Sequence, residues 1–347
     1  MILLLCFILL LLIFLLPFIP GIRELILKRD VAPLSVKSDY VKNPHYFAES
    51  FKGRMQPFMA TVGIAAGLNY VKLSKTEAVA TLGFEAVPDG ARFTDVCYAD
   101  HDLRTGREVS FAKELYVHGD VVMGSENELR ALACEGNVRL GSDSRIIRWL
   151  DATGSIHAEM NCDLGISVSC AGCLSLEQGV VFRRLYAFPV RAGEELAASR
   201  LEAAITDISA ELSVCDGAVL TASGGADRNI SDVPPRSNIA GSIITETSLV
   251  IGDGAVVCGH IKTYRNLTLG ENVTVAGNIF AEGSVHIGAG SRIQGIVFTQ
   301  DNVWLGPGVC IGAPGKIKSV VARNGISLDE GATVYGYIST EGEGIVA

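Results

Sequence analysis

Residues 249–312 read LVIGDGAVVCGHIKTYRNLTLGENVTVAGNIFAEGSVHIGAGSRIQGIVFTQDNVWLGPGVCIG, and this stretch contains a repeat of fixed length. An aliphatic residue followed by glycine recurs every 18 residues, at Ile251-Gly252, Leu269-Gly270, Ile287-Gly288 and Leu305-Gly306. Each pair is followed by a turn-like dipeptide: Asp253-Gly254, Glu271-Asn272, Ala289-Gly290 and Pro307-Gly308. A constant period of about this length is typical of solenoids, in which each repeat forms one turn of a coil.

A related pattern occurs earlier in the chain. Glycine followed by a variable residue and an aliphatic residue begins at Gly119, Gly136, Gly154 and Gly172, and again at Gly241, Gly259 and Gly277. We therefore predict an all-β solenoid with turns of about 18 residues, in two blocks at 114–186 and 239–347. Glycine would supply the positive φ that tight bends need. The alternative, an antiparallel sandwich of short strands, has no reason to keep this period.

The recurring aliphatic residues should point inward and stack on their copies, about 4.8 Å above and below. We accordingly expect Ile287 to be buried between Leu269 and Leu305. The last repeat, at 335–338, is followed by few residues that could cover it. Because uncovered strand edges pair with other chains, we expect residues 326–340 to form an end-to-end contact between copies, which Ile338→Lys would weaken.

Residues 1–22 contain no charged side chain. About 20 helical residues cross a hydrocarbon core of roughly 30 Å, so this stretch predicts an N-terminal transmembrane helix. A cleaved signal peptide is the alternative, but it would carry a positive first segment and a small-residue cleavage site. Arg23, Lys28, Arg29 and Lys37 follow the apolar stretch. They predict a single-pass protein of the inner (cytoplasmic) membrane with its body in the cytoplasm.

Composition agrees with this placement. The nine cysteines are scattered, apart from Cys170 and Cys173, which is typical of a reducing compartment rather than of a disulfide framework. The net charge of −9 gives no reason to expect a nucleic-acid partner.

Two regions lack the repeat. Residues 23–113 are predicted to form a mixed, membrane-proximal region. Residues 187–238 are predicted to hold one amphipathic helix and then a flexible linker at 223–236. The helix is indicated by apolar residues at helical spacing: Leu201, Ala204, Ile205, Ile208 and Leu212.

Candidate chemistry is sparse. Cys170 and Cys173, with Cys162 nearby, suggest a metal or redox site, but a structural zinc site normally has four ligands, so packing in the coil is the preferred interpretation. His260 and His286 lie in the repeats, and solenoids with six-residue periodicity include acyltransferases with a histidine base. In register, however, His260 aligns with Asn278 and Ile296, which favours a surface position. We predict no catalytic, cofactor-binding or metal-binding residue, and no enzyme activity.

The block from Gly241 to Ile338, with its 18-residue turns and motifs such as Gly277-Asn278-Ile279, resembles the bactofilins, bacterial polymer-forming cytoskeletal proteins. The resemblance implies a right-handed β-helix without a nucleotide, end-to-end polymerisation and membrane association. This chain departs from the family in its membrane segment, its upstream insert and its second insertion. The leading prediction is a membrane-anchored scaffold that assembles with itself and positions envelope proteins. The alternative is a membrane-anchored hexapeptide-repeat acyltransferase.

Overall fold

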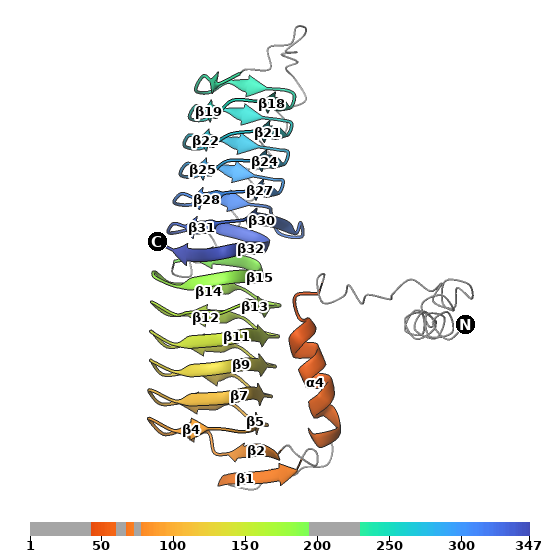
Figure 1. The fold of residues 1–347 in the computed structure, drawn as a ribbon, viewed down its shortest axis with the longest axis vertical. Helices are drawn as coiled ribbons and strands as arrows, with labels where there is room; N and C mark the ends of the chain where they lie inside the picture. The colour runs from red at the N-terminus through yellow and green to blue at the C-terminus, as the bar shows by residue number, and fades with distance from the viewer. Residues whose placement is uncertain (1–42, 60–66, 73–77, 194–229) are drawn as a thin grey trace, which may run out of the picture. The chain divides into compact units, whose positions relative to one another are not determined.

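The computed structural model describes residues 43–59, 67–72, 78–193 and 230–347. Apart from the helix α4 (Tyr46–Met59), the regular elements in these ranges are strands, and the strands belong to one hydrogen-bonded sheet. Most strands pair in parallel with the strand one turn away, so the chain winds into a coil of about 13 turns (Figure 1). The prediction of an all-β solenoid is confirmed. The predicted membrane segment, residues 1–22, lies outside the described ranges. Within the described ranges, no helix is long and apolar enough to cross a bilayer.

The C-terminal block contains the repeat that was read from the sequence. Its strands are β16 (Asp232–Val233), β17 (Asn238–Ile239), β18 (Ile243–Thr245), β19 (Leu249–Ile251), β20 (Val256–Val257), β21 (Ile261–Thr263), β22 (Leu267–Leu269), β23 (Thr274–Val275), β24 (Ile279–Ala281), β25 (Val285–Ile287), β26 (Arg292–Ile293), β27 (Val297–Thr299), β28 (Asn302–Leu305), β29 (Cys310–Ile311), β30 (Lys318–Ala322), β31 (Gly325–Leu328) and β32 (Thr333–Val346). Ile287 pairs in register with Leu269 on one side and Leu305 on the other, and it is fully buried, as predicted.

The glycines of the repeat have two different roles. The second residue of each turn dipeptide has a positive φ: 66° at Gly254, 55° at Asn272 and 68° at Gly290. The glycine of the Gly-x-aliphatic motif is needed for a different reason, because a Cβ on Gly277 would lie 2.3 Å from the carbonyl oxygen of Gly259 one turn away. The expectation that glycine serves the bends through φ therefore holds for the turn dipeptides, and close stacking explains the motif glycine.

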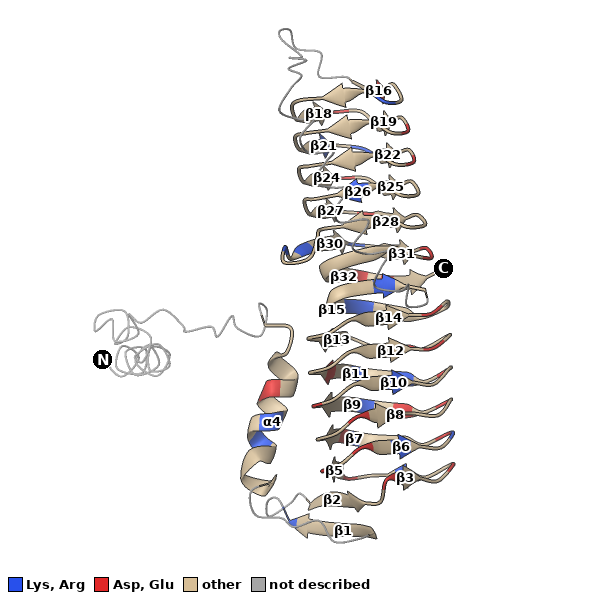
Figure 2. Cartoon of the chain, turned by 180° about the vertical axis from the view of Figure 1, so that it is seen from behind, with Lys and Arg blue, Asp and Glu red and all other residues tan. Residues whose placement is uncertain are grey.

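Polar side chains at the corners satisfy the backbone of the next turn. Asp253 Oδ1 accepts a hydrogen bond from the Glu271 N–H at 2.9 Å, and Asn266 Oδ1 accepts one from the Ser284 N–H at 3.0 Å. Lys, Arg, Asp and Glu lie on the turns and outer sides of the coil (Figure 2). The charged side chains thus stay outside the core of the coil, and the corner Asp and Asn side chains give the backbone N–H groups of the next turn hydrogen-bond partners.

The N-terminal block begins further upstream than predicted. Its strands are β1 (Gly67–Lys72), β2 (Ala78–Gly83), β3 (Ala86–Val87), β4 (Arg92–Phe93), β5 (Val96–Ala99), β6 (Leu103–Thr105), β7 (Ser110–Val117), β8 (Val121–Val122), β9 (Glu128–Cys134), β10 (Val138–Leu140), β11 (Arg145–Ala152), β12 (Ile156–Ala158), β13 (Ser167–Cys170), β14 (Leu174–Leu176) and β15 (Val181–Ala192).

Residues 78–113, predicted as part of a mixed region, already form turns of the coil. Phe93 pairs in parallel with Phe111, and their rings stack at 4.8 Å between centroids in the core. Here aromatic residues fill the column and Glu108 takes the positive φ of the turn, so the glycine-aliphatic pattern is missing although the 18-residue register is kept. β1 departs from this pattern, because it pairs antiparallel with β2.

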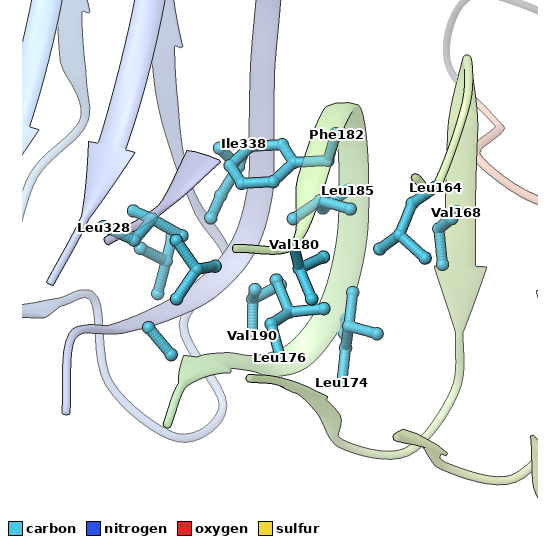
Figure 3. Packing of buried hydrophobic residues seen from close by; sticks show 14 of the residues in the cluster. Leu164, Val168, Leu174, Leu176, Val180, Phe182, Leu185, Val190, Leu328 and Ile338 are labelled. Atoms are coloured by element: carbon cyan, nitrogen blue, oxygen red, sulfur yellow. The ribbon is translucent and has the colours of Figure 1, made fainter. Parts of the chain in front are cut away.

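The two blocks meet at their C-terminal ends. β15 pairs in parallel with β13 and β14 of its own block and antiparallel with β32 of the other block. Leu185 lies opposite Ile338, and both side chains are buried (Figure 3). The predicted boundary at 187–238 is corrected at both sides: β15 continues to Ala192, and β16 forms inside the predicted linker with Val233 buried. β15 is extended by its pairing with β14 and β32, and β16 is ordered by its pairing with β19 of its own block. The predicted helix around Leu201 to Leu212 lies outside the described residues.

Candidate functional site

The end of the coil that was expected to contact another copy is occupied within the chain. β32 contains most of the predicted contact region 326–340, and residues 333–345 pair with β15 along its length. Tyr186 and Tyr337 face each other across this junction with ring centroids 4.8 Å apart. The prediction of an uncovered last repeat is therefore wrong, because the N-terminal block itself supplies the covering strand.

Two other ends remain in the described part of the chain. In the C-terminal block, the first turn is formed by β16, β17 and β18, and each of them pairs with a described strand on one side only. Ile239 lies at this end of the core and is partly buried. In the N-terminal block, β1 is the outermost strand and pairs with β2 alone, leaving Tyr70 61% exposed.

Helix α4 covers one side of the N-terminal block. Its Ala48, Met55 and Phe58 side chains are buried, and they form a second apolar cluster with residues of the strands, among them Tyr98 and Tyr116. The Phe58 ring lies edge-on to Tyr98 at 5.9 Å. Tyr98 of β5 and Tyr116 of β7 point outward from the coil, yet they are only 6% and 1% exposed, because α4 covers them.

A polar contact lies where helix α4 begins. Asp151 is the one buried Asp, Glu, Lys or Arg among the described residues. Its Oδ1 accepts a hydrogen bond from Ser169 Oγ at 2.7 Å and lies 2.5 Å from His45 Nδ1, directly before the helix. The hydrogen bond to Asp151 raises the pKa of His45, and the negative charges of Asp151 and Glu49 act in the same direction, against burial and Lys52. The contact therefore favours the protonated imidazole.

The docking of α4 is expected to depend on pH. The pKa of His45 is higher in the folded state than in the unfolded state, where a histidine has a pKa of about 6.5. Below the unfolded pKa the contact stabilises the folded state fully. This stabilisation is lost as the pH rises through the pKa of the folded state. Each unit of pKa difference changes the opening equilibrium by about tenfold. Amide exchange in α4, corrected for intrinsic rates, should be slower at pH 6 than at pH 8.5. The pH dependence should disappear in His45→Gln, and an unchanged dependence in that variant would exclude His45 as its source.

The cysteine motif lies inside the coil. Cys170 and Cys173 flank the corner between β13 and β14, and burial raises the pKa of the Cys170 thiol to about 12. Burial also raises the pKa of Cys162 to about 11. These thiols stay protonated at neutral pH, which suits packing rather than thiolate chemistry. Among the described residues, no group of three or more His, Cys, Asp and Glu could hold a metal ion.

One cysteine departs from the expectation of free thiols. Six described cysteines are free, whereas Cys258, at the corner between β20 and β21, is disulfide-bonded. The sequence had no signal for this bond, because Cys258 stands singly in the repeat.

The two histidines of the repeat occupy different outer positions. His260 Nδ1 accepts a hydrogen bond from the Asn278 N–H at 2.9 Å, so it takes the place that Asn278 Oδ1 takes for Ile296 one turn later. His286 is exposed and lies 6.2 Å from the Trp304 ring. His260 thus serves as a corner residue in its own turn, and the two side chains are not brought into a common cleft.

Comparison of the chain with protein-family models, with curated proteins and with solved structures gave no match.

Proposed function

We propose that this chain is a membrane-anchored structural scaffold, similar to a bactofilin, which assembles with itself through the ends of its coil and positions envelope proteins at the inner membrane. The observation that carries the proposal is the internal junction. There, two coil ends built from the same kind of turn join through the antiparallel strands β15 and β32, with Leu185 and Ile338 buried between them. Ends of this coil are thus chemically able to join.

The ends left in the described residues supply the surfaces for assembly. The first turn of the C-terminal block carries short strands whose outer edges have no described partner. Edge strands that are neither covered nor blunted by charge or proline pair with other chains. In this turn β16 contains Asp232 and is followed by two prolines, whereas β17 and β18 contain neither charge nor proline and supply the edge for pairing. Ile239 provides the apolar contact at this end. Assembly at this end would leave the outer sides of the turns accessible to other proteins, and residues 1–22 would hold the assembly at the membrane.

The proposal predicts that a charge at the first turn abolishes assembly. Ile239→Lys, in the full chain in detergent, should shift sedimentation from large species to the smallest species, because a lysine at the joint would be desolvated without a partner. Val250→Lys is the matched control, since Val250 is 46% exposed on an outer side of the next turn. Electron microscopy of both variants would show whether filaments or other polymers are lost. If the unmodified chain sediments as a monomer at tens of micromolar, the scaffold proposal is wrong.

A further inference from the structure

A groove runs along one side of helix α4. It has a volume of about 360 Å³ and lies between the helix and the strands β5, β7, β9 and β11, which the helix crosses (Figure 1). Phe51 belongs to the helix side of the groove and Trp149 of β11 to the strand side, and their rings meet edge-on with centroids 5.9 Å apart. Trp149 is partly exposed, so the groove presents an aromatic ring to its surroundings.

The groove is positively charged in a chain that is negative overall. Its lining contains three cations, Arg54, Lys113 and Arg130, and one carboxylate, Glu114, whereas the whole chain has a net charge of −9. Arg130 Nε is buried and has no hydrogen-bond acceptor among the described residues, since Glu114 Oε1 lies 3.5 Å away without forming a hydrogen bond. Buried donors without an acceptor are rare, and an anion bound in the groove would supply the acceptor.

The backbone explains why cations gather beside the groove. β7, β9 and β11 stack in parallel, and their register shifts where the strands bend. Lys113, Arg130 and Arg148 lie in the shifted segments of three successive turns, where the regular alternation of inward and outward side chains is interrupted. Parallel stacking therefore repeats a cation about every 4.8 Å. These three residues form what we call the cationic corner.

Carboxylates neutralise little of the cationic corner. Lys113 Nζ lies 3.5 Å from Asp95 Oδ1, and both side chains are at least one third exposed. Exposed ion pairs of this kind contribute little to stability and leave the cation available. Arg148 is exposed and forms no ion pair with any of the described residues. The corner can therefore attract a further anion.

Exposed apolar side chains flank the cations. Phe47 of α4 lines the groove and is 49% exposed, while Ile147 and Ile166, next to Arg148 in its own turn and in the following turn, are 41% and 44% exposed. Cations with apolar side chains between them are typical of surfaces that bind anionic bilayers, because phosphates attract the cations and the apolar groups enter the interface. A nucleic acid could use the cations and the aromatic ring, but it would leave the isoleucines in water.

We propose that the groove and the cationic corner bind the anionic phospholipids of a membrane surface. Lipid phosphates lie on the cationic corner, Trp149 lies at the level of the head groups, and Phe47 and Ile147 enter the interface. The N-terminal block then lies with this side against the bilayer. This inference goes beyond the proposed scaffold. It rests on that proposal only for the presence of a membrane, and it does not use residues 1–22.

Fluorescence quenching by brominated lipids tests the contact. The chain has two tryptophans, so Trp304→Phe leaves Trp149 as the single reporter. The full chain is mixed with vesicles of phosphatidylcholine, alone or with phosphatidylglycerol, that carry bromine on their acyl chains. Trp149 should be quenched by the vesicles that contain phosphatidylglycerol. The quenching should decrease at about 1 M salt, because the screening length falls to about 3 Å from about 10 Å at 0.1 M.

Charge reversal at the corner should abolish this quenching. Each cation near an anionic membrane strengthens binding by about fivefold, so Arg130→Glu combined with Arg148→Glu should weaken the contact by at least about 25-fold. The matched control is Arg104→Glu combined with Arg139→Glu, which changes the charge equally in the outward column of β6, β8 and β10. Unchanged hydrogen exchange in β9 and β11 would show that both variants are folded.

Three results would overturn the inference. The first is equal quenching by both kinds of vesicle or quenching by neither, and the second is quenching that the control variant also loses. The third is tighter binding of a single-stranded oligonucleotide than of the vesicles, which would assign the corner to nucleic acid. Flotation with vesicles of phosphatidylcholine alone reports the proposed anchor separately, so the anchor and this lipid site can fail independently.

Discussion

Ile287→Asp is expected to unfold the C-terminal block. Ile287 is fully buried in a column between Leu269 and Leu305, and no charged side chain among the described residues lies inside the coil to pair with an aspartate there. The substitution removes apolar contacts and places a carboxylate in the core, at a cost of about 4 kcal/mol or more. Because each turn is stabilised mainly by stacking on its neighbours, the loss should spread through the block.

Urea denaturation followed by circular dichroism measures this effect. The matched control is His286→Asp, which introduces the same residue one position earlier on the outer side of β25. It should change the free energy of unfolding by no more than about 0.5 kcal/mol. Equal stability of Ile287→Asp and the unmodified chain would show that the register of the column is wrong.

Leu185→Glu is expected to separate the two blocks at their junction. Leu185 is 1% exposed and lies opposite Ile338, so a glutamate would be buried against β32 without a cation beside it in the core. The cost should be about 3–5 kcal/mol, similar to that of an unpaired buried charge elsewhere. Amide exchange should accelerate in β15 and β32, while the middle turns of each block keep their protection.

Arg184→Glu is the control for the junction, because Arg184 is exposed on the outer side of β15 next to Leu185. Amide exchange in β32 of the Arg184→Glu variant should match that of the unmodified chain. If β32 also stays protected in Leu185→Glu, then the antiparallel pairing of β15 with β32 is not what holds the blocks together.

The coil could be predicted where its physical causes recur in the sequence. The buried column around Ile287 needs an aliphatic residue in every turn, and the bend at Gly254 needs a residue that tolerates a positive φ, so both leave a period of 18. The first turns could not be predicted in this way. Phe93 and Phe111 fill an interior column of the N-terminal block with stacked aromatic rings, and a single pair of aromatic residues does not establish a period.

Contacts between distant segments left no periodic signal. The pairing of Leu185 with Ile338 depends on two strands from different blocks, and an antiparallel junction of two parallel coils cannot be read from either block alone. The contact of His45 with Asp151 joins residues 106 positions apart. An aspartate within a strand gave one local hint, because a buried carboxylate requires a partner from elsewhere in the chain.

The junction also sets an order of events during synthesis. β15 ends at Ala192, and its pairing partner β32 begins at Thr333, so the ribosome must add about 140 residues before the pair can form. At about 5–20 residues per second, this takes roughly 7 to 28 seconds. During that interval the finished N-terminal block presents the edge of β15, with Leu185 and Val190 uncovered. Chaperones that shield strand edges should therefore engage nascent chains most strongly between the completion of β15 and the emergence of β32.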